Sequence, residues 1–589
     1  MTLRRASVLL PFLPLPFALS ACPGPDPMPD AGATDAADLA DAPEPRDAPA
    51  IDAEMHMGLR LPRCEDTDPM PTTALPHFAS TLEGTYLPHV ARLPMSGPLN
   101  PAEEEGELMY RALDYARTDP GPGLSHVHRN DLGADSTTTT GRHSIAWLAQ
   151  LSDFQLVDDE SPSRLSALDN PDIPSGLRAQ EAYLPRAVSA MSRTFQRITA
   201  GGRSLDFGII TGDCADSAQG NELDWVIQLM NGEPGLHTDS GDDDDPVPGP
   251  DNDPKDPFDP VAFPAPWLYV PGNHDVEIVG INAPSDRSRM QAIGTSPLGG
   301  TRDYRNWYGA VGRRAITADP ARHIVDRDEI VAAVRAATAD GPMGPSGHGY
   351  PASGDVDTTL GANWTLDVVP GVLRIVAIDT SDRSGGSEGL LTQDFIDGWL
   401  EPELDRAVTD GVLVMLASHH NTRSIDVYEG QGTDGPMVPG ALSGPEIEAI
   451  VASHPEVIAW LVGHVHDNQI RAVHGADAAH PGYWEIMASA IADFPSQARA
   501  IELVDNGDGT LSIFATLVDY DTDDCFERRF RALTQMEFVS AWAGNVTTDP
   551  AQLDVELVRA IPDSAADAVH AASATAPSRI ESLTTLLGE

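Results

Sequence analysis

Short runs of apolar residues recur through the middle of the chain, and polar residues follow each run directly. The clearest runs cover residues 145–151, 207–211, 267–270, 412–416 and 457–462. Runs this uniformly apolar are typical of strands buried on both faces. The apolar residues that recur at helical spacing between the first two runs are Val188, Met191, Phe195 and Ile198. Strand, helix and strand in this order predict a βαβ unit and an α/β fold.

The same patterns continue toward the C-terminus. Further strands are expected at 364–369, 373–378, 483–488, 500–504 and 511–518, and helices at 103–118, 330–337 and 392–408. The last two strands flank an Asn-Gly pair at Asn506 and Gly507, which indicates a hairpin turn. From about residue 529 onward, we expect a helix and then a peripheral, Ala-rich segment.

Acidic, amide and histidine residues follow five of the predicted strands. They lie in Ser-Asp-Phe-Gln at 152–155, Gly-Asp-Cys-Ala-Asp at 212–216, Gly-Asn-His-Asp at 272–275, Ser-His-His at 418–420 and Gly-His-Val-His at 463–466. Open α/β sheets bind ligands just outside the carboxyl ends of their strands, so one sheet edge could gather the motifs at 212–216, 272–275 and 463–466. Carboxylates and imidazoles bind metals, and two metals roughly 3.5 to 4 Å apart activate water and clamp a phosphoester. The motifs therefore predict a two-metal phosphoesterase site.

Each of these residues also has an ordinary interpretation. Asp213 and Asn273 lie beside glycines and could form turns. His419 and His420 could cap a strand, and the histidines of 463–466 could be surface residues. All of these interpretations would have to hold together, which favours the metal site.

In this order, the motifs resemble the calcineurin-like metallophosphoesterase superfamily, and the resemblance covers residues 145–520. It implies a four-layer αββα sandwich, in which two mixed sheets lie between helices. It also implies two divalent or trivalent metal ions (Mn, Fe or Zn) and direct attack of a metal-bridging hydroxide on a phosphorus ester. The candidate metal ligands are Asp153, Gln155, Asp213, Asn273, His419, His464 and His466.

The resemblance implies separate roles for these residues. The ligands of the first ion are Asp153 and His466, those of the second are Asn273, His419 and His464, and Asp213 bridges both. His274 would act as the outer acid or as an electrostatic clamp on the phosphate, and Asp216 would orient it by hydrogen bond. His419 is expected rather than His420 because the family's ligand is usually the first residue after the strand.

The chain departs from the superfamily at Gln155, where Asp-x-His is the common pattern. A Gln oxygen can bind a hard cation or hold a water, but it is a poorer zinc ligand than imidazole. Whether Gln155 binds metal therefore stays open. The purple acid phosphatase branch has a Tyr at the position of Asp216, which disfavours that branch. The segments 152–164 and 493–497 are similar to a bacterial group of metallophosphoesterases of undefined substrate.

The chain begins like a secretory signal, with two arginines before an apolar stretch at 8–19. That stretch is too short to span a membrane, and prolines interrupt it. Leu-Ser-Ala-Cys at 19–22 resembles the lipobox of bacterial lipoproteins, whose cysteine becomes lipid-modified. Ordinary cleavage after Ala21 is the alternative, but it places Leu19 where a small residue is preferred. We therefore expect export across the inner membrane and a lipid anchor on Cys22 in the cell envelope, at the outer membrane on its periplasmic or surface side.

The expected regions are a lipoprotein signal peptide at 1–22, a disordered Pro/Ala/Asp-rich linker at 23–58, an N-terminal extension at 59–144, a catalytic domain at 145–528 and a C-terminal tail at 529–589. Two insertions interrupt the catalytic domain. The first, at 231–260, is strongly acidic and is expected to be a mobile loop. Calcium binding by this segment is the alternative, although the ligand spacing of a calcium loop is missing. The second, at 278–361, is expected to form walls of the substrate pocket.

Besides Cys22, the chain has Cys64, Cys214 and Cys525. An exported protein can form disulfides, and Cys64 with Cys525 is the favoured pair because Cys214 lies in a metal-site loop. Sequence alone does not prove that connectivity. Cys214 could instead be a thiolate ligand, but a small buried loop residue is the simpler interpretation.

The negative charge of the chain limits which partners it can bind. Its 589 residues include 37 Lys and Arg and 90 Asp and Glu, which gives a formal charge of −53. Such acidity argues against a nucleic-acid-binding surface. It does not argue against a small phosphoester substrate, because divalent cations would dominate the local field. The sequence therefore indicates a metallophosphoesterase hydrolysing a phosphomonoester or phosphodiester. The alternatives are nucleotidase or phospholipid-headgroup diesterase specificity, and a non-catalytic metal- or ligand-binding surface lipoprotein with a degenerate first site.

Overall fold

The computed structural model describes residues 64–575, with gaps at 68–71, 73, 95, 139–140, 172, 202–203, 306, 338–346, 431–434 and 545. The chain divides into two units, Met1–Arg60 and Leu61–Glu589, and all described residues belong to the second. The expected signal peptide, Cys22 and the linker at 23–58 lie outside them. None of the helices in the described residues has both the length and the apolar character that a membrane span requires.

The first large sheet has seven strands and is mixed. Its strands, in spatial order, are β3 (Val127–Arg129), β17 (Val555–Ala560), β16 (Thr510–Val518), β15 (Ala498–Asp505), β4 (His143–Leu151), β5 (Phe207–Thr211) and β6 (Trp267–Val270). β4, β5 and β6 are parallel, whereas β15 is antiparallel to both β4 and β16. The predicted βαβ unit is present, because α3 (Leu184–Ala200) lies between β4 and β5 in the chain.

The second large sheet has six strands and is also mixed. Its strands, in spatial order, are β13 (Gln469–Asp477), β14 (His480–Met487), β12 (Val457–Val462), β10 (Leu413–Ser418), β8 (Leu373–Ile378) and β7 (Trp364–Val369). The four inner strands pair in parallel, and both edge strands pair antiparallel to them. Two small sheets pair β1 (Gly84–Pro88) with β2 (Thr118–Pro122) and β9 (Gly389–Leu390) with β11 (Ile425–Asp426).

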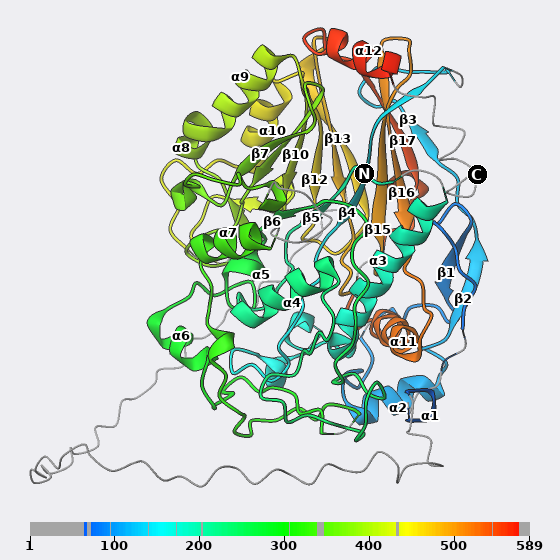
Figure 1. Ribbon diagram of the computed structural model, residues 1–589, viewed down its shortest axis with the longest axis vertical. Coiled ribbons are helices and arrows are strands. Elements are labelled where there is room, and N and C mark those ends of the chain that lie inside the picture. Colours follow the sequence, from blue (N-terminus) through cyan, green and yellow to red (C-terminus); the bar gives the residue numbers. More distant parts are fainter. Residues whose placement is uncertain are drawn as a thin grey trace, which may run out of the picture. The chain divides into compact units, whose positions relative to one another are not determined.

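Strand β10 shows how sheets and helices pack together. Leu413, Met415 and Ala417 belong to the larger core, which includes residues of the seven-stranded sheet. Val414 and Leu416 alternate with them and belong to a second core. The helices that contribute to that second core are α9 (Glu401–Asp410) and α10 (Gly444–Ala452), which Figure 1 shows beside the six-stranded sheet. The fold is therefore mixed α/β, with mixed sheets flanked by helices.

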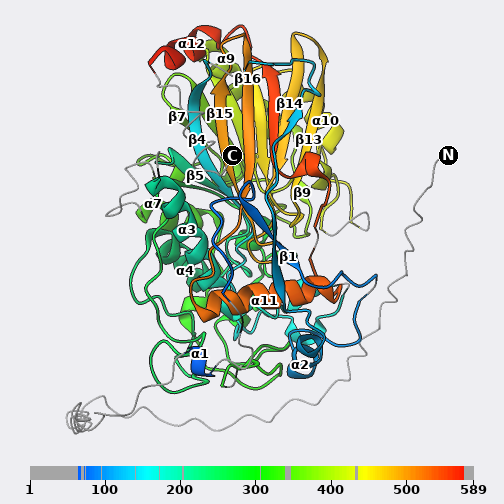
Figure 2. The same ribbon diagram turned by 90° about the vertical axis from the view of Figure 1, so that its right-hand side faces the viewer.

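Helix α11 (Cys525–Val539) joins the N-terminal extension to the larger core. It contacts α3, α2 (Glu104–Ala112) and α1 (Cys64–Thr67), and Figure 2 shows it running horizontally above α1 and α2. A disulfide links Cys64 to Cys525, with a Cα–Cα distance of 6.1 Å, which is the predicted pairing. The remaining α-helices are α4 (Gly220–Asn231), α5 (Asn273–Val276), α6 (Asp286–Ala292), α7 (Arg327–Ala336), α8 (Gln393–Phe395) and α12 (Ala566–Thr575).

The C-terminal region differs from its expected structure. We expect a helical and Ala-rich tail at 529–589, but β17 from this region is an inner strand of the seven-stranded sheet, between β16 and β3. Strand β3 comes from the N-terminal extension at 59–144 and pairs in parallel with β17. Both terminal regions therefore complete the sheet, and the tail is not purely helical.

Candidate metal centre

The predicted site residues lie in loops that follow strands of both large sheets. Asp153 follows β4, and Asp213 follows β5. Asn273 and His274 begin α5, which follows β6. His419 follows β10, and His464 and His466 follow β12. Because β4, β5 and β6 are parallel, and β10 and β12 are parallel, each sheet presents the carboxyl ends of these strands together.

Several of these residues have an unusual backbone conformation. The φ angles of Asp153, Asp213, His464 and His466 are 53°, 54°, 77° and 59°, in the left-handed region that L-residues rarely adopt. Each such residue costs on the order of 1 kcal/mol or more and persists only where its surroundings fix it. Close packing adds a further constraint at Gly272, where a Cβ atom would lie 2.2 Å from Oδ1 of Asp213. The loops therefore hold their side chains in fixed positions.

Asp153 and His466 form one half of the centre. Nε2 of His466 lies 3.1 Å from Oδ1 of Asp153, and Nδ1 lies 2.5 Å from Oδ2 of Asp493. Arg178 donates from Nε to Oδ1 of Asp493 at 3.0 Å. A carboxylate that holds the outer nitrogen of a histidine fixes the ring and directs the other nitrogen inward, as around many bound metals.

Asp213, His419, Asn273 and His464 form the other half. Nε2 of His419 lies 3.0 Å from Oδ2 of Asp213, while Nδ1 donates to the carbonyl of Thr211 at 2.7 Å. The amide of Asn273 donates to the carbonyl of Gly280 at 2.8 Å, and this leaves its Oδ1 buried without a hydrogen-bond partner. The ring centroids of His419 and His464 are 5.2 Å apart.

His420 has a different environment from its neighbour His419. Its Nδ1 is 2.8 Å from the hydroxyl of Thr380, and its Nε2 is 3.0 Å from the carbonyl of Ser387. Both ring nitrogens therefore already have protein partners, although Nδ1 or Nε2 of His420 also lies within 4.8 Å of ring nitrogens of His419 and His464. The inward nitrogen of His419 has no such hydrogen bond.

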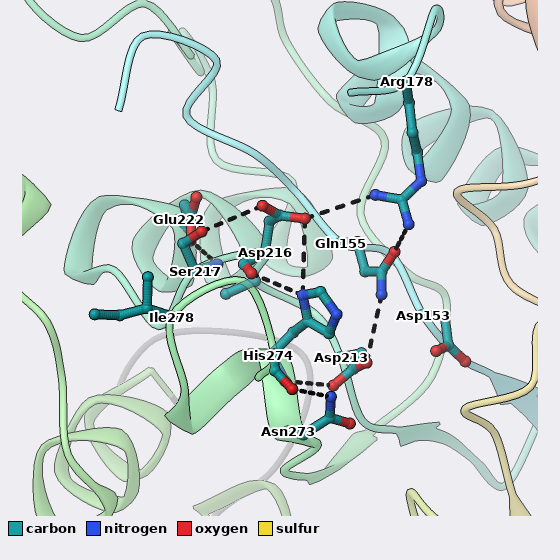
Figure 3. Close-up of polar contacts among 12 residues, drawn as sticks. Asp153, Gln155, Arg178, Asp213, Asp216, Ser217, Glu222, Asn273, His274 and Ile278 are labelled. Atoms are coloured by element: carbon teal, nitrogen blue, oxygen red, sulfur yellow. Dashed lines mark hydrogen bonds and ion pairs between the residues drawn. The ribbon is translucent and has the colours of Figure 1, made fainter. Parts of the chain in front are cut away.

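His274 lies beside the centre and contacts Asp216 and Asp213. Its backbone N–H donates to Oδ1 of Asp213 at 2.8 Å, and its Nδ1 lies 2.7 Å from the main-chain carbonyl of Asp216 (Figure 3). We expect Asp216 to orient His274 by hydrogen bond. The carboxylate of Asp216 is 3.7 Å from Nδ1 and accepts from Arg164 at 2.7 Å. The main chain of Asp216, not its carboxylate, therefore makes the hydrogen bond.

Gln155 is positioned differently from a metal ligand. Its Oε1 accepts a short hydrogen bond from Nη2 of Arg178, and its Nε2 lies 3.4 Å from Oδ2 of Asp213 (Figure 3). The oxygen lone pairs therefore face the guanidinium, and the N–H₂ group faces the centre. No sequence motif singles out Arg178, which lies 23 residues after Gln155.

Replacing Gln155 by Ala should leave the metal content of the protein unchanged, because its oxygen faces Arg178. Turnover should fall by about tenfold, since the pocket loses a group that holds Arg178. Elemental analysis of the purified variant measures this, with Asp153→Ala as the comparison that should lose metal. Equal metal loss in the two variants would show that Gln155 is a ligand.

The charges of the centre favour a cation. Burial lowers the pKa of His419 and His466, but the carboxylates of Asp213 and Asp153 outweigh it and raise these values to about 9 and about 10. Burial and the neighbouring His419 lower the pKa of His464 to about 3. Burial would also raise the pKa of Asp213, but the adjacent histidines hold it well below its usual range. Two buried carboxylates thus attract positive charge.

The donor atoms fit bound metal ions. Oxygen or nitrogen atoms of Asp153, Asp213 and His419 lie within 4.8 Å of one another. The buried atoms without a hydrogen-bond partner include Oδ1 of Asp153, Oδ1 of Asn273 and Nε2 of His419. Mixed oxygen and imidazole nitrogen donors suit Mn, Fe and Zn. Cys214 is buried, and none of the metal-ligand groups in the described part of the chain includes it.

The centre opens into a cavity of about 250 Å³. Lining residues that matter here are Arg178, His274 and His464, with Val279 and Ile281 from the insertion at 278–361. This insertion therefore contributes to the walls of the cavity. A larger cavity of about 610 Å³ is lined by none of the candidate site residues.

Comparison with known proteins gives little further information. No family model matches the chain, and no curated protein matches it. Among solved structures, the structure of PhoD is similar over 72% of this chain and 80% of that chain, with 10% sequence identity and a TM-score of 0.26. A TM-score of this size fixes neither the fold nor the activity of the chain.

Proposed function

We propose that the chain is a metal-dependent phosphoesterase with a binuclear centre, built on the αββα sandwich of the calcineurin-like superfamily. The observation that carries this proposal is a set of buried carboxylate, amide and imidazole groups that converge. Oδ1 of Asn273 has no hydrogen-bond partner, and Oδ1 of Asp153 and Nε2 of His419 are held only by ion pairs within the set. These groups come from two sheets, and the outer atoms of several are already held by the protein. Such preorganisation is what a resident metal centre requires.

The candidate ligands divide between two ions according to the two halves of the centre. Asp153 and His466 would hold one ion, and Asp213 would contact both. The residues that would hold the other ion are Asn273, His419 and His464. When bound, two cations roughly 3.5 to 4 Å apart lower the pKa of water and neutralise charge on a phosphoester. Gln155 would act on Arg178 and not on a metal, because its oxygen accepts from that guanidinium.

His274 is placed to act on the substrate rather than on a metal. Its Nδ1 is held by the carbonyl of Asp216, which leaves Nε2 as the nitrogen that can serve a bound phosphoester. In its doubly protonated form, the ring would donate from Nε2 to the leaving oxygen. Arg178 lines the same cavity and adds a fixed positive charge, held by Gln155 and Asp493. Both groups favour an anionic substrate.

A cavity of about 250 Å³ suits a small phosphoester. Two narrower substrate classes fit the same chemistry: nucleotides and phospholipid headgroup esters. A membrane anchor on Cys22 would favour the phospholipid, because it would hold the enzyme beside its substrate. A non-catalytic metal- or ligand-binding lipoprotein is the second candidate, because the departure at Gln155 removes one expected ligand. The preserved position of His274 favours the enzyme.

Hydrolysis of a chromogenic phosphodiester and of the matching monoester by the full chain tests the proposal. The protein is freed of metal and then supplied with manganese, iron or zinc. Metal-dependent turnover is expected, and the ratio of the two rates ranks diester against monoester. Folded, metal-loaded protein that hydrolyses neither compound would favour the non-catalytic binder.

Metal binding should release about two protons per chain near pH 7. His419 and His466, with pKa values raised to about 9 and about 10, are protonated in the metal-free protein at this pH and must lose a proton from Nε2 to bind metal. The apparent metal affinity should therefore rise from pH 6 to pH 9. Calorimetric titration in buffers of different ionisation enthalpy measures the protons released. An affinity that does not change with pH would contradict this ligand assignment.

A further inference from the structure

A second group of carboxylates lies away from the metal centre, where the acidic insertion at 231–260 meets the loop after β4. This acidic cluster consists of Asp159, Glu160, Asp239, Asp243 and Asp244. One carboxylate oxygen each from Glu160, Asp239 and Asp243 lies within 4.8 Å of the others. The sequence alone does not bring these residues together, because they are about 80 positions apart. The fold therefore places acidic groups side by side that would repel one another.

Three buried oxygens in the cluster have no hydrogen-bond partner. The side chain of Asp239 is 1% exposed; its Oδ2 accepts from the N–H of Asp244 at 3.1 Å, but its Oδ1 has no partner. Oδ2 of Asp159 and Oε2 of Glu160 are also buried without a hydrogen bond. The nearest cation to Oε2 of Glu160 is Nη2 of Arg322, at 3.6 Å. Buried carboxylate oxygens are normally paired, so these three atoms indicate a missing positive partner.

The positive groups near the cluster are engaged by other carboxylates. Arg302, Arg305 and Arg314 line the cavity beside Glu160 and Asp243, but Arg302 pairs with Glu181, and Arg305 and Arg314 pair with Asp303. Lys255, the only lysine in the sequence, is buried and donates to Oδ1 of Asp159 at 2.7 Å. Arg322 is engaged mainly by the neighbouring Asp158, at 2.8 Å. Oδ1 of Asp239 and Oε2 of Glu160 therefore have no cation within hydrogen-bond distance.

We propose that the acidic cluster binds one calcium ion through Glu160, Asp239 and Asp243. Ca²⁺ takes oxygen ligands at about 2.3 to 2.6 Å, so two oxygens on one ion lie at most about 5 Å apart, as these three do. The donors of this group are all carboxylate oxygens, which suit a hard cation and not a soft one. A neighbouring group joins Asp239 to His237 and Asp242, and its imidazole makes zinc the competing ion.

The calcium ion would link the loop after β4 to the acidic insertion at 231–260. The loop of Asp159 and Glu160 continues to Arg164, which holds the carboxylate of Asp216. The insertion at 278–361 reaches the same place, because the N–H of Arg302 donates to the carbonyl of Asp159 at 2.9 Å and that of Tyr304 donates to Asp244 at 2.5 Å. Loss of calcium should therefore lower stability without removing the catalytic ions.

The test is calorimetric titration of the chelator-treated full chain with calcium chloride, combined with thermal unfolding. Wild-type protein should bind one calcium ion at this site and unfold at a higher temperature with calcium than without. The double variant Glu160→Gln/Asp239→Asn should lose calcium affinity by about tenfold or more, since two charged ligands are gone. Asp245→Asn removes one charge from an exposed position of the same loop, which matches Asp243→Asn, and it should bind calcium as wild type does. Asp213→Asn should also keep this ion, which separates it from the catalytic ions.

Asp243→Asn is the second variant, because Asp243 is exposed and its replacement disturbs no buried contact. It should weaken calcium binding even if the double variant fails to fold. The proposal is overturned if wild-type protein binds no calcium at millimolar concentration, or if Asp243→Asn and the double variant bind it unchanged. It is also overturned if zinc displaces calcium at equal concentration and His237→Ala abolishes binding, because the neighbouring group would then be the site.

Discussion

Asp213→Asn should lose both bound metal and activity, with a fall in kcat/KM on the order of 10³ or more. Oδ2 of Asp213 lies 3.0 Å from Nε2 of His419, and Oδ1 accepts from the N–H of His274. Asn keeps the size of the side chain but replaces one charged oxygen with an N–H₂ group. The bridge between the two ions would then have a single neutral oxygen. Elemental analysis and steady-state kinetics on the same preparation measure both losses.

Asp224→Asn is the matched control, because Asp224 is an exposed residue of α4 whose carboxylate accepts a hydrogen bond from Gln228 at 2.9 Å, away from the metal centre. It should keep full metal content and rate. Thermal unfolding separates a local loss of metal from a loss of fold. If Asp213→Asn retained two ions per chain and wild-type turnover, Asp213 would not be the bridging residue.

His274→Ala should keep both metals but reduce turnover by about 10² to 10³. The ring lines the cavity, and its Nδ1 is held by a carbonyl rather than directed at the ligand set. Its removal therefore takes away a proton donor on the substrate side. The loss should appear mainly in kcat, and it should be smaller for a substrate whose leaving group needs no proton. Kinetics with a series of leaving groups of different pKa measures this.

His454→Ala provides the comparison for His274→Ala, because His454 follows α10 and lies outside the cavity. It should change neither rate nor metal content. Equal activity of wild type and His274→Ala on a poor leaving group would exclude His274 as the acid. Metal loss in His274→Ala would instead make the ring a ligand or a support for one.

The site could be predicted from the sequence where an apolar run that forms a strand is followed directly by residues that can bind metal. The runs at 207–211, 267–270 and 457–462 form strands with those bounds, since uniformly apolar runs are stable only when buried on both faces. The motifs after β5 and β6 converge because parallel strands end on the same edge of one sheet. The motif after β12 comes from the second large sheet, so the expectation that one sheet edge gathers all three motifs is wrong. The pairing of Cys64 with Cys525 was also predictable, because only one other cysteine outside Cys22 competed and it lies in the site.

Other features depend on contacts between distant segments. Arg178 reaches Gln155 from a separate segment, so the orientation of the Gln155 amide could not be read from its neighbours. Strand β17 gains its partners from β3 and β16, and its pattern alone did not indicate a strand in the C-terminal region. The acidic cluster joins loops about 80 residues apart and gives no local signal.

Two metal ions are expected at the ends of these strands. Anomalous diffraction from crystals of the manganese-loaded protein would locate them. Two peaks roughly 3.5 to 4 Å apart are expected, both touching Asp213. One peak should also contact Asp153 and His466, and the other should contact Asn273, His419 and His464. A single peak, or peaks that touch none of these side chains, would contradict this expectation.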